Sequence, residues 1–220
     1  MRTAVLSAVA AVALGLAPAA WSAPPRDGVR DEVRRDLDDA RREIRTELAE
    51  ARAELETGNL DVGDAVQFGR DRRRGRDADA TLPKAEITPR GDFLIDGRAV
   101  AIDDGQRHQL LAYRGLVIDI ARAGIDIGEV TALAAVDAVD RGTFGLVFSA
   151  LTGSLERRIE RTVRQSVEPG ALRICARMPA LHAAQQQLAS GLPAFRPYAR
   201  MEAHDAETCR DEVRSQLATR

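Results

Sequence analysis

The stretch that decides the fold is Ile87-Thr88-Pro89-Arg90-Gly91-Asp92-Phe93-Leu94-Ile95-Asp96-Gly97-Arg98-Ala99-Val100-Ala101-Ile102. Short apolar runs alternate in it with two turn sequences, Gly91-Asp92 and Asp96-Gly97. An Asp-Gly pair between apolar runs is typical of the type I′ turn of a β-hairpin, because both central residues of that turn need positive φ. The stretch therefore predicts a small antiparallel hairpin or three-stranded meander.

A helical region is predicted after this hairpin. Asp103 and Asp104 are suitable N-caps, and Gly124 is expected to end the first helix. The spacing of apolar residues predicts further helices at 129–151, 154–168, 171–176, 179–190 and 202–217, with Pro169-Gly170 as a break. The predicted class is therefore α+β and mostly α, with the small sheet followed by a bundle of four to five helices.

The start of the chain has the pattern of an export signal. Met1-Arg2 is positively charged, Ala4 to Leu16 is apolar, and small residues follow up to Ala23. This is typical of a cleavable signal peptide and is short for a membrane span, although a retained N-terminal anchor is the alternative. We divide the chain into a signal peptide (1–22), a long charged helix (23–60), an Arg-rich flexible linker (61–82) and a hairpin plus helical domain (83–220).

The long charged helix carries one apolar stripe. Its members recur at intervals of four, four and three residues, which keeps them on one face of a nearly straight helix. They are Val29, Val33, Leu37, Ala40, Ile44, Leu48, Ala51 and Leu55. Something must cover this stripe, because so polar a helix is not stable alone. The cover is either the rest of the same domain, or a partner protein or second copy in a coiled-coil-like contact.

Two groups of arginines are candidates for contact with anionic surfaces. The linker holds Arg70, Arg72, Arg73, Arg74 and Arg76, and the helix predicted at 154–168 holds Arg157, Arg158, Arg161 and Arg164. No aromatic residues alternate with the linker arginines, so stacking on nucleic-acid bases is not supported. Each group either contacts anionic lipid head groups or is a solvated segment.

The most unusual position in the helical region is Arg114. Helical periodicity places it beside Tyr113 in the middle of an apolar face, and an unpaired buried charge is very costly. The guanidinium must therefore extend to the edge of that face or pair with a carboxylate. Candidate partners are Asp137 and Asp140 on the next predicted helix, or Asp96 in the hairpin turn. Tyr113 and Arg114 are also the best candidates for an anion-binding pocket.

The two cysteines, Cys175 and Cys209, suit an oxidising compartment. A bridge between them would close a loop of about 35 residues. The alternatives are two buried thiols or an intermolecular link. Neither cysteine has a second thiol or a histidine at ligand spacing, so no metal site and no cofactor is predicted.

The hairpin and its helix also carry a family resemblance. Ile87-Thr88-Pro89, Gly91-Asp92, Leu94-Ile95, Gly97 and Val100 lead to Gln106-Arg107, Leu110-Leu111 and Tyr113-Arg114. This ordered set, within Ile87 to Arg122, resembles the YggN-type family of uncharacterised proteobacterial proteins that are predicted to be periplasmic. The resemblance implies a periplasmic location and no assigned activity.

The sequence does not indicate a catalytic activity. The sequence has no nucleophile elbow, phosphate-binding loop or zinc-protease motif, and its three histidines are scattered. The net charge of −2 and the 30% of charged residues are ordinary for a soluble protein. We therefore expect a non-catalytic exported protein that binds a partner or itself through helix faces. The alternatives are a binder of anionic lipid surfaces and an enzyme of unrecognised type.

Overall fold

The computed structural model describes residues 26–63, 82–142 and 154–218. The predicted signal peptide, the linker arginines and the end of the helix predicted at 129–151 lie outside these ranges. The described residues form the α-helices α1 (Arg26–Thr57), α3 (Asp104–Gly142), α5 (Ser154–Gly191) and α6 (Ala203–Ala218), with a 3-10 helix η1 (Pro193–Tyr198). Together with a small antiparallel sheet, they confirm the predicted class, α+β and mostly α.

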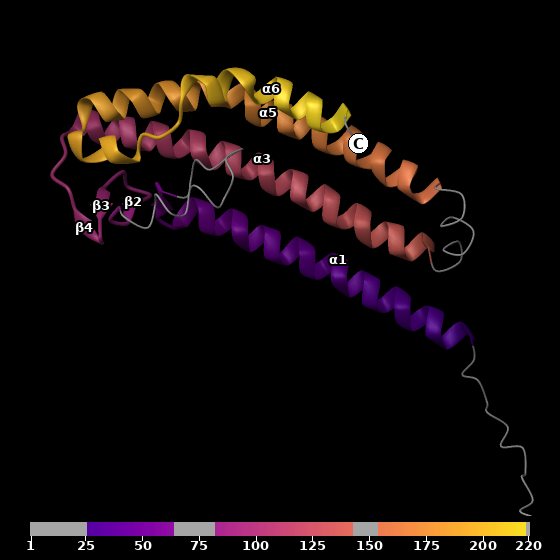
Figure 1. Ribbon diagram of the computed structural model, residues 1–220. Coiled ribbons are helices and arrows are strands. Elements are labelled where there is room, and N and C mark those ends of the chain that lie inside the picture. The colour runs from indigo at the N-terminus through magenta and orange to yellow at the C-terminus, as the bar shows by residue number, and fades with distance from the viewer. Residues whose placement is uncertain (1–25, 64–81, 143–153, 219–220) are drawn as a thin grey trace, which may run out of the picture.

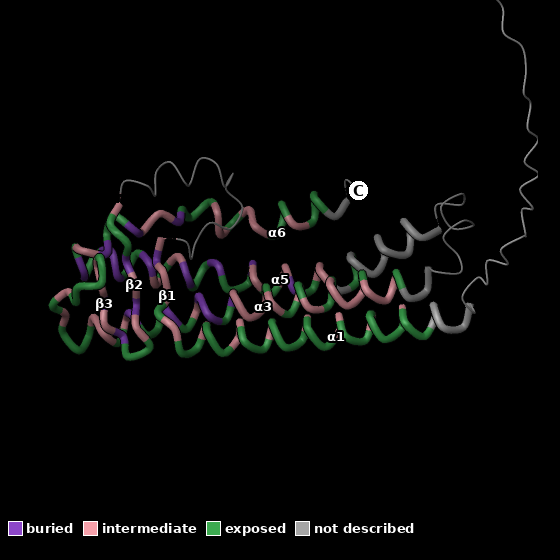
Figure 2. The backbone as a smooth tube through the Cα atoms, turned by 90° about the horizontal axis from the view of Figure 1, so that it is seen from below, coloured by how far each residue is buried: buried purple, intermediate pink, exposed green. Residues whose placement is uncertain are grey.

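The helices α1, α3 and α5 form an elongated layer (Figure 1), and α6 lies on one face of that layer (Figure 2). α1, α3 and α5 lie side by side in that order, α6 packs on α5, and each helix runs antiparallel to its neighbour in the series. The sheet lies at one end of the layer, which we call the sheet end. The opposite end, where α1 and α5 begin and α3 finishes, is called the distal end.

The sheet has four antiparallel strands in the order β1 (Leu60–Asp61), β2 (Ala85–Ile87), β3 (Phe93–Ile95) and β4 (Arg98–Ala99). Asp96 and Gly97 have φ values of 48° and 74°, so the predicted turn with positive φ at both central residues is confirmed. The meander of the last three strands is confirmed as well. β1 was not predicted, because two residues show no alternating pattern.

α3 begins with a reciprocal cap. The Oδ1 atom of Asp103 accepts a 2.7 Å hydrogen bond from the backbone N–H of Gln106, and the Oε1 atom of Gln106 accepts one of 2.9 Å from the N–H of Asp103. Two N–H groups that the helix leaves unpaired are thereby satisfied. Asp103 is therefore the N-cap, as predicted.

The predicted helix end at Gly124 is wrong, because α3 continues to Gly142. A glycine inside a helix costs about 1 kcal/mol relative to alanine. Packing of this half of α3 between α1 and α5 offsets that cost, since Ile125, Ile127 and Leu133 are partly buried there. The two helices predicted on either side of Gly124 are consequently one.

The predicted break at Pro169-Gly170 is also wrong, and α5 runs through both Pro169 and Pro179. Both prolines are exposed, and a helix tolerates the local opening that proline causes more readily on its outer side. Gly170 is buried. A Cβ atom at Gly170 would stand 2.5 Å from Cγ1 of Ile127, so this glycine allows close approach of α5 to α3 rather than ending a helix.

α1 packs its predicted apolar stripe on α3 of the same chain, whereas contact of α1 with a partner protein or a second copy stays a prediction. The described members of the stripe, from Val33 to Leu55, are half-buried. β1 pairs with β2, and Val62 is buried in the core. The predicted linker therefore starts too early, since residues 61–62 belong to the folded unit.

The fully buried core lies at the sheet end (Figure 2). It joins the sheet to α3, α5 and η1, and Phe93, Phe195 and Tyr198 form tilted and edge-on ring contacts within it. Among the described side chains, the buried positions finish at Ile120 on α3 and begin at Gly170 on α5. The described parts of the helices beyond these positions have only half-buried and exposed side chains.

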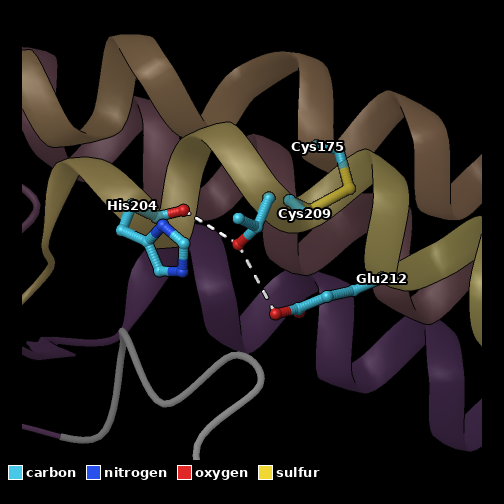
Figure 3. Close-up of a disulfide and its surroundings, with 5 residues drawn as sticks. Cys175, His204, Cys209 and Glu212 are labelled. Carbon is cyan, nitrogen blue, oxygen red and sulfur yellow. Dashed lines mark hydrogen bonds between the residues drawn. A yellow bond between two sulfur atoms is a disulfide. The ribbon is translucent and has the colours of Figure 1, made fainter.

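A disulfide joins Cys175 of α5 to Cys209 of α6, with Cα atoms 5.5 Å apart (Figure 3). The predicted intrachain pairing is thereby confirmed, and there are no free cysteines. Beside the bridge, the hydroxyl of Thr208 donates to the carbonyl of His204 at 2.9 Å. The disulfide holds α6 on α5.

Candidate functional site

Arg114 caps a helix, and no carboxylate among the described residues pairs with it. Its Nη2 atom donates to the carbonyl oxygens of Leu55 and Glu56, each at 3.0 Å, and to that of Gly58 at 2.7 Å. These carbonyls lie at the C-terminal end of α1, where a helix leaves acceptors unpaired and a cation is favoured. Arg114 is 7% exposed, and burial lowers the pKa of its guanidinium. It therefore anchors α1 to α3.

The predicted partner Asp137 is wrong because it lies on the same helix as Arg114. Twenty-three residues of one helix separate the two side chains by about 35 Å. Asp137 instead accepts a 2.8 Å hydrogen bond from Nη2 of Arg41 in α1. The second candidate, Asp140, has a side chain outside the described set, and the third, Asp96, contacts the backbone N–H of Lys84. The structure does not bring the predicted group together.

Tyr113 belongs to the core rather than to a pocket. Its ring meets that of Phe195 edge-on at a centroid distance of 5.4 Å, and it is fully buried. Its hydroxyl faces the amide of Gln185 without a hydrogen bond of standard geometry, and burial raises its pKa to about 12. The Oε1 atom of Gln185 accepts from the N–H of Met201 at 2.9 Å. This polar pair is sealed from solvent.

The feature of α3 that sequence reasoning missed is an uncovered strip, defined here as Gly124, Gly128, Thr131, Ala135 and Val139. All five positions are exposed. A Cβ atom added at Gly124 or Gly128 would meet nothing within 4 Å. The hydroxyl of Thr131 donates to the carbonyl of Ile127 at 2.7 Å, so its methyl group remains as the apolar surface. Val139 is 54% exposed.

The uncovered strip continues the core face of α3. Leu110, Tyr113, Val117 and Ile120 form that face at the sheet end and are buried. The steps from Ile120 onward are four, four, three, four and four residues, which is the spacing of one helix face. The continued periodicity across Gly124 is the signal in the sequence that indicates the strip, but a glycine at that position also predicts a helix end.

The opposite side of the layer is closed by ion pairs between α1 and α3. Arg52 donates to Asp126 at 2.8 Å and to Glu129 at 2.7 Å, and Arg41 pairs with Asp137. Successive residues of an α-helix are about 100° apart, so two residues nine positions apart lie on opposite sides of the helix. Gly128 is nine residues from Asp137, and Ala135 is nine residues from Asp126. The uncovered strip therefore lies on the side of α3 opposite these ion pairs.

α1 carries an acidic ridge on the same side of the layer as the uncovered strip. The ridge consists of Glu32, Asp36, Asp39, Glu43, Glu47, Glu50 and Glu54, all exposed. Asp39 pairs with Arg42, and no ion pair is found for the other six among the described side chains. Glu43 is nine residues from Arg52, and Glu50 is nine residues from Arg41. Both arginines reach toward the ion-paired side, so these glutamates lie on the opposite side of α1. The ridge therefore points to the strip side.

The remaining predicted site residues are only partly described. The linker arginines Arg70, Arg72, Arg73, Arg74 and Arg76 lie outside the described ranges. Arg157, Arg158 and Arg161 stand in the first turns of α5, but their side chains are not described, whereas that of Arg164 is exposed. Within the described ranges there is no group of three potential metal ligands. Helices long and apolar enough to span a bilayer are also absent from that part of the chain.

No protein-family model, curated protein or solved structure matches this chain. A flat apolar strip with small side chains allows another helix to approach closely, and carboxylates along one border favour a partner with cationic groups. The arrangement fits macromolecular binding.

Proposed function

We propose that the protein is an exported, non-catalytic binding protein that docks another polypeptide on the uncovered strip of α3. The observation that carries the proposal is the change in burial along one helix face. Val117 is 4% exposed at the sheet end, whereas Val139 on the same face is 54% exposed. An apolar face that continues a core without a cover is typical of an interaction surface.

Export is supported by two independent features. The first 22 residues have the pattern of a cleavable signal peptide, and the Cys175–Cys209 disulfide is compatible with an oxidising compartment. The resemblance to the YggN-type family points to the same compartment, the periplasm. We therefore place the binding event in the cell envelope.

A protein partner fits this side of the layer better than an anionic membrane does. The acidic ridge borders the strip, and its carboxylates would repel anionic head groups approaching from that side. A helix with an apolar stripe and a cationic border meets no such repulsion. The proposal therefore favours a polypeptide over a lipid surface.

Site-specific photo-crosslinking tests the proposal. A photoreactive amino acid replaces Ala135 on the uncovered strip or, as the matched control, Ala112, which is also an exposed alanine of α3 but lies on the other side. The full chain is expressed in a Gram-negative cell and irradiated there. We expect a discrete protein adduct from position 135 and none from position 112. Equal labelling at both positions, or none at either, would contradict the proposal.

A further inference from the structure

We propose that the Cys175–Cys209 disulfide is a redox-controlled latch, which a dithiol opens to release α6 from α5 while the rest of the chain stays folded. The bond joins the last described helix to the helix beside it, with a sequence separation of 34 residues (Figure 3). Because no further described element follows α6, this helix can move away without carrying another part of the fold with it. The latch does not depend on what the uncovered strip binds.

α6 contributes little to the core. Side chains are described for residues 203–216 of this helix, and none of them is buried. The half-buried apolar residues among them are Ala206, Cys209 and Val213. Isolated helices of about 12–15 residues are marginal in water, because burial of an apolar face supplies most of the stability of a helix. With 16 residues and so small an apolar contact, α6 depends on a further attachment.

Two anchors hold α6 in place, and the first lies just before the helix begins. Met201 is 3% exposed, and its N–H donates to Oε1 of Gln185 in α5 at 2.9 Å. Tyr198 of η1 is buried too, and its hydroxyl donates to the carbonyl of Pro83 at 2.8 Å. The second anchor is the disulfide at Cys209. With the bridge open, the chain is still fixed as far as Met201, whereas α6 is held only by half-buried residues and surface contacts.

A dithiol opens the bridge in two exchange steps. Cys209 is partly exposed and Cys175 is 2% exposed, so the first thiolate attacks the sulfur of Cys209. A mixed disulfide forms there, and the sulfur of Cys175 leaves as a thiolate that takes up a proton. The second thiolate of the dithiol then attacks the dithiol sulfur of the mixed disulfide, which releases Cys209 to take up a proton. The protein disulfide gains two electrons, and the dithiol is oxidised to a disulfide.

Release of α6 opens one side of the layer. Cys175 is 2% exposed while it is bonded to α6, so departure of the helix uncovers this part of α5. η1 leads into α6, and its Phe195 meets Tyr113 on the core face of α3, which the uncovered strip continues. α6 therefore lies on the same side of the layer as the strip. The latch controls how much of this side is open to solvent.

Hydrogen exchange followed by mass spectrometry tests the latch on the full chain, with dithiothreitol as the dithiol. We expect the amides of α6 to exchange at least about tenfold faster after reduction, while those of the buried segments 110–120 and 181–192 keep their protection. The control carries Cys175→Ser with Cys209→Ser, and its α6 should exchange fast with or without dithiothreitol. Unchanged protection of α6 after reduction would overturn the latch. Loss of protection in α3 and α5 together with α6 would overturn it as well.

Thiol labelling with N-ethylmaleimide gives a second measurement. Cys209→Ser leaves Cys175 as the single thiol of the chain. We expect Cys175 of the folded variant to react within about tenfold of its rate in urea, because α6 no longer covers it. A rate more than about 100-fold below that in urea would overturn the latch. A variant that circular dichroism shows to be unfolded would overturn it too, since the rest of the chain is expected to stay folded.

Discussion

The guanidinium of Arg114 in α3 donates a 2.7 Å hydrogen bond to the carbonyl oxygen of Gly58, the residue that follows the end of α1. The same nitrogen reaches two further carbonyls in the last turn of that helix. The C-terminal end of α1 is thereby closed by a charged side chain from a neighbouring helix. This contact fixes α1 at the sheet end, while its other half rests on a half-buried stripe and surface ion pairs.

Replacing Arg114 by methionine should lower the free energy of unfolding by about 2–4 kcal/mol, because three carbonyls lose a charged donor in a buried place. Urea denaturation measures the loss. The matched control is Arg122→Ala, which removes an exposed pair between the same two helices, with Glu56, and should cost about 0.5 kcal/mol. Equal losses in the two variants would show that the cap contributes no more than a surface pair.

Reducing the Cys175–Cys209 bridge should destabilise the chain by about 3–4 kcal/mol, since the bond closes a loop with a sequence separation of 34 residues. Thermal unfolding with and without dithiothreitol measures the change. The chain with both cysteines replaced by serine should unfold at the lower temperature in either condition. Insensitivity of the wild-type midpoint to the reductant would contradict a stabilising bridge.

The two tyrosines should resist ionisation in the folded chain. Burial raises the pKa of Tyr113 to about 12, and burial followed by the charge of Asp96 raises that of Tyr198. A raised tyrosine pKa means that folding favours the neutral form. The associated stability is complete below the ordinary value of 10.0 and is lost as pH rises from there toward 12.

Absorbance at 295 nm during an alkaline titration measures this ionisation. Because the chain has only two tyrosines, Tyr198→Phe isolates the titration of Tyr113. We expect little phenolate in that variant at pH 10 and its appearance only as the chain unfolds. A reversible midpoint near 10 in the folded variant would show that Tyr113 is accessible to solvent.

Local features of the fold could be predicted from the sequence, and features that depend on distant partners could not. The Asp96-Gly97 turn and the Asp103 cap are set by neighbouring residues, so pattern reasoning found them. Gly124 and Pro169 were expected to end helices because their intrinsic preferences oppose helix formation. Packing between α1, α3 and α5 outweighed those preferences, and no local pattern contains that energy.

The candidate site shows the same limit. A buried charge at Arg114 could be predicted from helical periodicity, but its acceptors were backbone atoms of a helix more than fifty residues earlier in the chain. The apolar periodicity of α3 indicates the uncovered strip, but the exposure of the strip depends on where the core of the folded chain ends. The spacing of the acidic residues is enough to indicate the ridge on α1. The side of the layer on which the ridge lies follows only from the positions of Arg41 and Arg52 in the structure.

The measurement that tests the central claim most directly compares Val117→Ala with Val139→Ala, two identical truncations on one face of α3, by urea denaturation. Val117→Ala should cost about 2 kcal/mol, because its side chain is in the core. Val139→Ala should cost less than about 0.5 kcal/mol, because its side chain is largely exposed on the uncovered strip. A cost equal to that of Val117→Ala would contradict an uncovered strip.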